Sequence, residues 1–237
     1  MHIALIGYGR MGQAIHELAR QRQHHITIIE VGDELNLNRF TEGRPDVAIE
    51  FTVPESAPGN LRTCFDLGIP VVCGTTGWLE HRADIESYCL KQSGTFFYAS
   101  NFSIGVNMFF RLNEFLARLM NGRSGEYQAS VHEIHHTGKK DAPSGTAITL
   151  AEGILGHNHD YSNWGTQPGQ DQVLPVTSER LDPFPGTHII RYSGPTDEIV
   201  ISHAAHSRQG FAAGALAVAE WLPGNKGILG MRDFLPF

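Results

Sequence analysis

A glycine turn, Gly7-Tyr8-Gly9-Arg10-Met11-Gly12, joins a short apolar segment to a helical pattern near the start of this 237-residue chain. The apolar segment is His2 to Ile6, and the helical pattern runs from Gln13 to Arg20. At this spacing the first glycine permits a tight turn, the second lets a pyrophosphate approach the backbone, and the third lets the helix pack closely on the strand. The turn therefore predicts the first strand–helix unit of a dinucleotide-binding (Rossmann) sheet.

Strand and helix patterns alternate over the first hundred residues, which predicts a parallel sheet covered by helices on both faces. The further strands expected there are His25 to Glu30, Asp46 to Phe51, Pro70 to Cys73 and Thr95 to Ala99, and the expected helices are Ser56 to Leu67 and Leu79 to Lys91. Loops beyond the carboxyl ends of parallel strands line the ligand crevice of such folds. The residues directly after each of these strands are therefore candidates for cofactor binding.

The pattern changes in the second half of the chain, where longer strands are separated by Pro/Gly turns and predict a mixed sheet. The expected elements are a helix over Asn107 to Met120, strands over Glu126 to His135, Val176 to Leu181, His188 to Tyr192 and Ile199 to Ala205, helices over Ala147 to Leu155 and Phe211 to Leu222, and a loop or flap over His157 to Gln172. In the first helix Met108, Leu112, Phe115 and Leu119 form one apolar stripe, and Met108, Phe109 and Phe110 are expected in the core.

We therefore predict an α/β protein of two domains. An N-terminal Rossmann dinucleotide-binding domain comprises residues 1–104 and 209–237, and a smaller α+β domain with a mixed sheet, at residues 105–208, binds the substrate and other subunits.

Glu30 ends the second expected strand, eighteen positions beyond Gly12. A carboxylate at this place accepts hydrogen bonds from the adenosine ribose hydroxyls and repels a 2′-phosphate. The next residue is Val31 and not an arginine, which favours NADH over NADPH as the cofactor, although Arg10 in the glycine turn could reach a phosphate. The alternative interpretation of Glu30 is a solvated acid at a strand end.

A second segment rich in chemistry runs from His135 to Thr146, with the sequence HHTGKKDAPSGT. It ends a strand pattern, crosses a loop with Lys139 and Lys140, and opens a helix at a Ser-Gly-Thr turn. The free N–H groups and the dipole at a helix N-terminus favour an anion, and imidazoles exchange protons near neutral pH. The segment predicts a carboxylate-bearing substrate and a proton-transfer step.

Plainer interpretations of the same residues stay open. His136 faces the substrate beside His135 only if the strand ends at His135, because neighbouring strand residues point to opposite faces. Lys140 is either a substrate contact or a solvated surface lysine. The histidines His132, His135 and His136 lack a matching set of cysteine or acidic partners, so we predict no metal site.

The composition limits the partners. The net charge of −7 argues against nucleic acid and anionic membranes. The three cysteines, Cys64, Cys73 and Cys89, have no CxxC spacing and cannot all pair, which favours a reducing compartment. The chain has no signal-peptide pattern and no apolar stretch of about 18 residues. We expect a cytoplasmic globular protein with a small-molecule substrate.

Five segments resemble one known family. They are the Gly7–Gly12 turn, Gly74–Gly77 (GTTG), Asn101–Asn107 (NFSIGVN), Glu133–Ala147 (EIHHTGKKDAPSGTA) and Ser207–Ala215 (SRQGFAAGA). The family is 4-hydroxy-tetrahydrodipicolinate reductase, formerly dihydrodipicolinate reductase, of diaminopimelate and lysine biosynthesis. The resemblance spans nearly the whole chain.

The resemblance implies the NAD(P)H-dependent reduction of a cyclic imine dicarboxylate, 4-hydroxy-tetrahydrodipicolinate, to tetrahydrodipicolinate with loss of water. It implies that His135 is the acid/base group, that Lys139 donates a proton, and that the enzyme is a homotetramer built through the second domain's sheet. The implied substrate-binding residues are His136, Ser144, Gly145 and Thr146. The candidate cofactor-binding residues are Gly7, Tyr8, Gly9, Arg10, Met11, Gly12, Glu30, Phe51, Thr52, Gly74, Thr75, Thr76, Ala99, Ser100, Asn101 and Phe102.

This sequence departs from the family pattern at Val31, where many members have a basic residue, and in the short segment between Glu30 and Asp46. Two other functions stay open. One is a different Rossmann oxidoreductase acting on an amino-acid-derived substrate, such as an aspartate or homoserine dehydrogenase. The other is a non-catalytic module that senses NAD(H), for which His135 and Lys139 would be dispensable.

Overall fold

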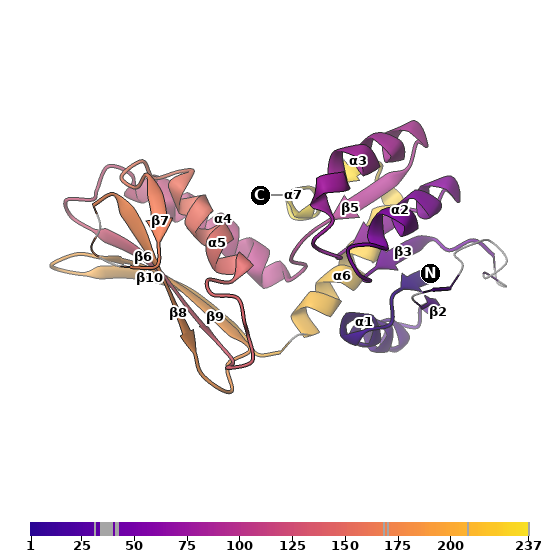
Figure 1. The fold of residues 1–237 in the computed structure, drawn as a ribbon, viewed down its shortest axis with the longest axis horizontal. Coiled ribbons are helices and arrows are strands. Elements are labelled where there is room, and N and C mark those ends of the chain that lie inside the picture. Colours follow the sequence, from indigo (N-terminus) through magenta and orange to yellow (C-terminus); the bar gives the residue numbers. More distant parts are fainter. Residues whose placement is uncertain are drawn as a thin grey trace. The chain divides into compact units, whose positions relative to one another are not determined.

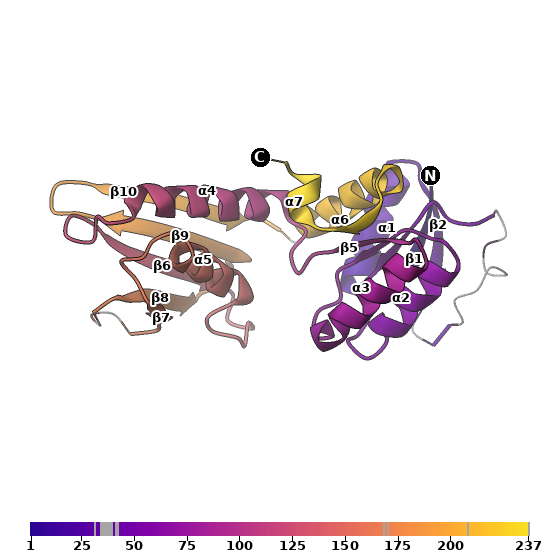
Figure 2. The same cartoon turned by 90° about the horizontal axis from the view of Figure 1, so that it is seen from above.

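A computed structural model describes residues 1–30, 32–33, 40, 43–167, 169, 171–207 and 209–236. The chain divides into two compact units, each built on its own sheet (Figures 1 and 2). The first unit contains Met1–Ile104 and Gln209–Phe237, and the second contains Gly105–Arg208. The chain therefore returns, at Gln209, to the unit in which it began.

The first unit has a six-stranded, all-parallel sheet with the strand order β11-β5-β4-β3-β1-β2. The strands are β1 (His2–Ile6), β2 (His25–Ile29), β3 (Val47–Glu50), β4 (Val71–Cys73), β5 (Thr95–Tyr98) and β11 (Gly227–Leu229). The Rossmann-like parallel sheet predicted from the alternating pattern is confirmed. Strand β11 was not predicted, because three residues are too few to show a period.

Helices cover both faces of this sheet. They are α1 (Arg10–Gln21), α2 (Ala57–Asp66), α3 (Arg82–Lys91), preceded by the 3₁₀ turn η2 (Leu79–His81), and α6 (Gln209–Trp221), followed by η3 (Leu222–Gly224) and α7 (Met231–Phe234). Side chains alternate along each strand, so Ile3 and Leu5 pack in one buried cluster and Ala4 and Ile6 in another. Burial on both faces explains why the inner strands β1, β3 and β4 are mainly apolar.

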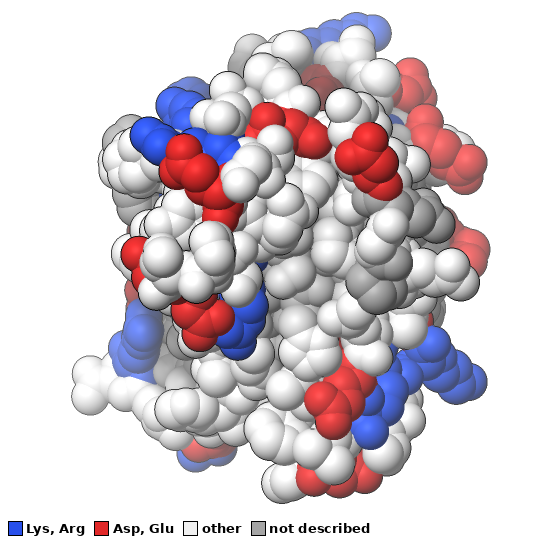
Figure 3. All heavy atoms as spheres, turned by 90° about the vertical axis from the view of Figure 1, so that its left-hand side faces the viewer, with Lys and Arg blue, Asp and Glu red and all other residues white. Residues whose placement is uncertain are grey.

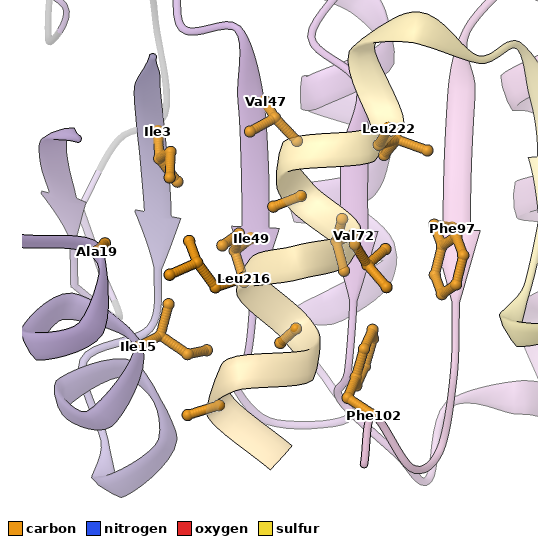
Figure 4. Close-up of a cluster of buried hydrophobic side chains, with 14 of the residues drawn as sticks. Ile3, Ile15, Ala19, Val47, Ile49, Val72, Phe97, Phe102, Leu216 and Leu222 are labelled. Carbon is orange, nitrogen blue, oxygen red and sulfur yellow. The ribbon is translucent and has the colours of Figure 1, made fainter. Parts of the chain in front are cut away.

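Helix α6 lies against the sheet on the same face as α1. Figure 4 shows Leu216 of α6 beside Ile49 of β3, and Leu222 of η3 belongs to the same buried cluster. The contact is close at Gly214, where an added Cβ atom would lie 1.8 Å from the carbonyl oxygen of Phe102. A glycine is therefore required for α6 to pack on the chain that leaves β5.

The second unit has a five-stranded mixed sheet with the order β10-β9-β6-β8-β7. The strands are β6 (Gln128–His135), β7 (Asn163–Gly165), β8 (Val173–Arg180), β9 (Gly186–Ser193) and β10 (Glu198–Ala205), and the helices are α4 (Ile104–Met120) and α5 (Gly145–Leu155). Strands β6, β8 and β7 run parallel, whereas β6, β9 and β10 are antiparallel neighbours. The predicted mixed sheet is confirmed, but β7 lies within the segment predicted to be an irregular loop.

The apolar stripe predicted on α4 does not face the core of this unit. Met108, Leu112, Phe115 and Leu119 are 48–57% exposed. The buried side of the helix carries Phe109, Leu116 and Met120 instead, which pack with α5 and the sheet. The expectation that Met108 is a core residue was wrong, because α4 carries apolar residues on two sides and periodicity alone does not say which side packs inward.

The surface of the second unit mixes both signs of charge. In Figure 3 acidic and basic side chains lie next to one another, and uncharged atoms cover much of the visible face. Two of the ion pairs on this unit are Arg111–Glu114, at 2.8 Å, and Arg123–Glu126, at 3.4 Å. Among the described residues, no helix has the length and apolar character needed to cross a membrane.

Candidate active site

The glycine turn between β1 and α1 has three glycines with different structural roles. Gly7 has φ +93° and an added Cβ would lie 2.1 Å from the carbonyl oxygen of Phe51, while a Cβ at Gly12 would lie 2.2 Å from that of Gly7. Both are required by the fold itself. A Cβ at Gly9 would meet no atom within 4 Å. Gly9 therefore leaves open space at the start of α1, which has no side-chain cap and can receive a phosphate.

The loops that follow β3, β4 and β5 meet at the same edge of the sheet, as parallel strands require. Phe51 packs so closely on Gly74 that a Cβ there would lie 2.1 Å from its ring. The backbone N–H of Thr52 donates to Oγ1 of Thr75 at 2.8 Å. The tertiary structure thus joins the predicted segments Phe51–Thr52 and Gly74–Thr76 into one surface.

Some candidate cofactor residues also serve the core. Phe102 is 2% exposed and Ala99 is 8% exposed, and both pack with the α6 side of the sheet. Their side chains have little surface for a ligand, whereas Ser100, from the same loop, is exposed and Asn101 is partly exposed.

Two candidates at the adenosine side have local partners. The hydroxyl of Tyr8 lies 2.7 Å from Nδ1 of His16. Glu30 is exposed, and its backbone N–H donates to the Asp33 carboxylate at 3.0 Å. Val31 lies outside the described residues. The Glu30 carboxylate is therefore accessible to a ribose hydroxyl.

Glu50, a fully buried carboxylate at the end of β3, is not among the residues predicted for the site. It accepts hydrogen bonds from the hydroxyl of Thr52 and from Sγ of Cys73, the latter at 3.1 Å. Burial, followed by the negative charge of Glu50, raises the pKa of Cys73 well above its ordinary value. This thiol therefore stays protonated and links the ends of β3 and β4.

In the second unit, β6 ends at His135, so His136 begins the following loop. His135 is 8% exposed and lies on the helix-covered face of the sheet. His132 lies on the opposite face, where its Nδ1 is 2.8 Å from Oγ1 of Thr177. The condition for both His135 and His136 to serve the site, that the strand ends at His135, is met.

The loop after β6 is held by charged side chains. Nζ of Lys139 donates to both carboxylate oxygens of Asp141 at 2.9 Å, and this bond lowers the pKa of the Asp141 carboxyl. The Arg180 guanidinium donates to the backbone carbonyls of Lys139 and Asp141. Lys140 is exposed. Lys139 therefore has a defined position, and a substrate carboxylate could replace Asp141 as its partner.

Helix α5 begins at the Ser-Gly-Thr turn, as predicted. Ser144 is the N-cap, and its Oγ accepts a hydrogen bond from the backbone N–H of Ala147 at 3.2 Å. Gly145 is exposed and Thr146 is half-buried, whereas Ser144 is 3% exposed. Gly145 and Thr146 thus present the accessible end of the helix, and Ser144 faces the interior.

A buried polar cluster lies behind this loop, and only its member His135 was predicted from the sequence. Oε1 of the fully buried Glu133 accepts hydrogen bonds from Ser144 N at 3.1 Å, Ser178 Oγ at 2.8 Å and Arg180 Nη2 at 3.1 Å. Its other oxygen, Oε2, lies 3.4 Å from Nε2 of His135 and 3.5 Å from Nε2 of His188. Burial raises the pKa of the Glu133 carboxyl, but the surrounding donors outweigh this effect and hold it well below its ordinary value.

The proximity of two members of this cluster, Glu133 and His135, could be predicted from their spacing in the sequence. Glu133 and His135 are two residues apart on a strand and therefore share a face. His188 and Arg180 are brought in by β9 and β8, which flank β6.

Glu133, His135 and His188 also have the donor atoms of a metal site, because one ligand atom from each lies within 4.8 Å of the others. The set differs from the three histidines considered from the sequence. Arg180 donates to the same carboxylate at 3.1 Å and would repel a bound cation. The prediction of a site without metal is therefore retained.

Residues 1–102 match the family described as "Dihydrodipicolinate reductase, N-terminus", and residues 105–235 match "Dihydrodipicolinate reductase, C-terminus". The chain belongs to the dihydrodipicolinate reductase family. It is 46% identical over 235 residues to the 4-hydroxy-tetrahydrodipicolinate reductase of Christiangramia forsetii, covering 99% of this chain and 98% of that protein. The relative from Methanococcoides burtonii is 32% identical over 231 residues, covering 95% and 85%. The resemblance stated from the sequence is confirmed.

Solved structures agree with the fold of the reductase family. The dipicolinate-bound dihydrodipicolinate reductase from Paenisporosarcina sp. TG-14 matches with a TM-score of 0.77 and 21% identity, covering 99% of each chain. An amine dehydrogenase from Mycobacterium smegmatis matches with a TM-score of 0.55 and 10% identity, covering 97% and 94%. The second likeness shows that this two-unit fold also occurs in a dehydrogenase of another name.

Proposed function

We propose that this protein is a 4-hydroxy-tetrahydrodipicolinate reductase. A hydride and a proton are added to the cyclic imine dicarboxylate, one water leaves, and tetrahydrodipicolinate and the oxidised nicotinamide are formed. The observation that carries this proposal is 46% identity to a reductase of that name across 99% of the chain. The first unit binds the dinucleotide, and the second binds the dicarboxylate.

The first unit fits a dinucleotide at the edge where β1, β3, β4 and β5 end. The reduced nicotinamide supplies the hydride when bound. Gly9 and the uncapped start of α1 suit the pyrophosphate. Glu30 would bind the ribose hydroxyls, and its charge favours NADH because a 2′-phosphate would be repelled. The exposed residues Thr76 and Ser100 would line the nicotinamide side.

The second unit fits a dicarboxylate and a proton donor. The start of α5, with Gly145 and Thr146, offers N–H groups to one carboxylate. His136 and Lys139 lie on the loop that precedes this helix. When the substrate binds, Lys139 would release the Asp141 carboxylate, form an ion pair with a substrate carboxylate, and give a proton to the ring. A relative solved with dipicolinate, a flat ring dicarboxylate, supports this substrate class.

The test is a coupled assay in which the imine is made in situ from pyruvate and aspartate semialdehyde, with NADH and NADPH supplied separately. We expect consumption of both, with kcat/KM about tenfold higher for NADH, because a like charge within a few ångströms costs roughly 1–4 kcal/mol. In Glu30→Ala the ratio of kcat/KM for NADH to that for NADPH should become smaller. An NADPH advantage would reject the role of Glu30. No consumption of either cofactor would reject the reductase and leave the amino-acid dehydrogenase and the NAD(H) sensor.

We further propose a homotetramer assembled through the second unit. Val200, 42% exposed, pairs with Arg191 on the sheet face opposite the buried Tyr192, and the exposed α4 stripe adds apolar surface. Exposed apolar side chains that gather on a surface are typical of protein–protein interfaces. Sedimentation equilibrium should give the mass of four 26.1 kDa chains, and Val200→Glu should give smaller species. A wild-type monomer at all concentrations would contradict the assembly.

A cytoplasmic location is also proposed. Cys64, Cys73 and Cys89 are all free and buried, and free thiols persist in reducing compartments.

A further inference from the structure

We propose that Glu133 and His188 are positioning residues for His135, and that Glu133 stabilises the imidazolium form of His135 from which a proton is delivered. The inference rests on the proposed function, which gives His135 its acid/base role. Glu133 and His188 touch neither substrate nor cofactor in this scheme, since they are 0% and 5% exposed. They act through the ring of His135.

The ring of His135 is fixed from two sides. Its Nδ1 lies 3.2 Å from the carbonyl oxygen of Pro185, which can only accept a hydrogen bond, so Nδ1 carries a proton. The backbone of Gly186 also packs closely on the ring, since an added Cβ there would lie 2.7 Å from Cε1 of His135. Nε2 is therefore the nitrogen of His135 that can gain or lose a proton while the contact to Pro185 is kept.

Nε2 of His135 belongs to a triangle of polar atoms. It lies 3.4 Å from Nε2 of His188 and 3.4 Å from Oε2 of Glu133, and the two last atoms are 3.5 Å apart. These N···O contacts are longer than ordinary hydrogen bonds, and Oε2 is a buried atom without a hydrogen-bond partner. A buried carboxylate oxygen in that state costs free energy unless a proton donor turns to it.

The hydrogen bonds within the triangle depend on how many protons its three polar atoms carry. With Nδ1 of His135 protonated, a neutral His135 offers only a lone pair at Nε2. Nε2–H of His188 has three acceptors within reach, namely this lone pair, Ser144 Oγ at 3.2 Å and Oε2 of Glu133 at 3.5 Å, and it can make a good bond to only one of them. One additional proton on Nε2 of His135 makes that atom a donor to Glu133 and supplies the bond that Oε2 lacks. In the reaction this proton replaces the one that Lys139 gives to the ring, so one proton is consumed in each turnover, and solvent then restores the proton on Nε2 of His135.

The charged and titratable groups around the triangle come from four neighbouring strands and from the loop after β6. Strand β6 contributes Glu133 and His135, β8 contributes Arg180, and β9 contributes His188. His203 of β10 lies opposite His188, and burial together with His188 lowers the pKa of His203. Lys139 and Asp141 neutralise each other on the adjacent loop. Hydrogen-bond donors around the Glu133 carboxyl hold its pKa well below its ordinary value, so this carboxylate is the negative charge available to an imidazolium.

Glu133→Gln tests this arrangement with little change of shape. The three donors at Oε1 require an acceptor there, so the amide oxygen will take that place and the amide NH₂ group will face His135. That group donates to a neutral Nε2 and opposes a protonated one. We expect kcat to fall about 10–100-fold, a share of the contribution of acid–base catalysis, with KM for the dicarboxylate within about threefold. The alkaline limb of kcat should move to lower pH by about one unit or more.

A second readout does not need the reaction. Ring ¹⁵N spectra, with His135 assigned by its loss in His135→Gln, should show both ring nitrogens protonated in the wild type at a pH where Glu133→Gln shows Nδ1 alone. The matched control is Glu179→Gln on β8, whose carboxylate lies 3.6 Å from Nε2 of His132 on the other face of the sheet. It should leave kcat, the pH profile and the His135 spectrum unchanged.

The outcomes separate the two proposals. A wild type without reductase activity would reject the proposed function, while the ring spectra would still decide the role of Glu133. An unaltered pH profile and His135 spectrum in a folded Glu133→Gln would overturn the inference, and so would stoichiometric metal bound to the three side chains. If that variant does not fold, His188→Gln decides: kcat about tenfold lower at unchanged KM supports the inference, and wild-type kcat overturns it.

Discussion

His135→Ala and Lys139→Ala are each expected to lower kcat by about 10²- to 10⁴-fold, the range that a positioned acid or base contributes, while the Kd of NADH changes by less than about twofold. The reason is their location: both residues belong to the second unit, on β6 and the loop after it. The residues proposed to bind the dinucleotide are all in the first unit. Steady-state kinetics and a fluorescence titration of NADH measure the two quantities separately.

Lys140→Ala is the matched control for Lys139→Ala. The two lysines are adjacent, but Lys139 is held by Asp141 and Arg180, whereas Lys140 is exposed. We expect kcat of Lys140→Ala within about threefold of wild type, since an exposed charge contributes little. A loss of NADH affinity as large as the loss of kcat in either test variant would contradict the assigned roles. An equal effect of the two lysines would contradict the choice of Lys139 as the donor.

Gly9→Ala and Gly12→Ala are expected to separate cofactor binding from folding. At Gly9 an added methyl group meets no atom of the protein within 4 Å, and φ of −74° suits alanine. The fold should keep its melting temperature within about 2 °C, while the Kd of NADH should rise about tenfold or more. The methyl group would occupy the space through which a pyrophosphate approaches the backbone, and tenfold corresponds to about 1.4 kcal/mol.

Gly12→Ala should instead damage the first unit. Its methyl group would lie 2.2 Å from the carbonyl oxygen of Gly7, so α1 would have to move away from β1. Overpacking of this kind costs about 1–3 kcal/mol, which lowers the melting temperature of a chain of this size by roughly 2–12 °C. A strongly destabilised Gly9→Ala with unchanged NADH affinity would refute the assignment of the turn. Thermal melts of both variants, with and without NADH, make the comparison.

The first unit was largely predictable because its signals are local. A strand, a glycine turn and a helix are neighbours in the sequence, and β1 has the predicted bounds. The short strands β7 and β11 were not predicted. Each has only three residues, too few to show a period, and forms a strand because it pairs with β8 or β5. The inward side of α4 escaped because the helix has two apolar sides, and only its packing partners select one.

By itself, the sequence determined the parallel Rossmann sheet, the family, and the segment from His135 to Thr146. Each was predicted from residues that are close together in the sequence. Only the tertiary structure placed His188 and Arg180 around Glu133, because these residues come from β9, β8 and β6 and meet through strand pairing. It also decided that Phe102 faces the core and the α4 stripe faces outward. The physical reason is that burial and strand register are properties of the packed chain, which local periodicity does not specify.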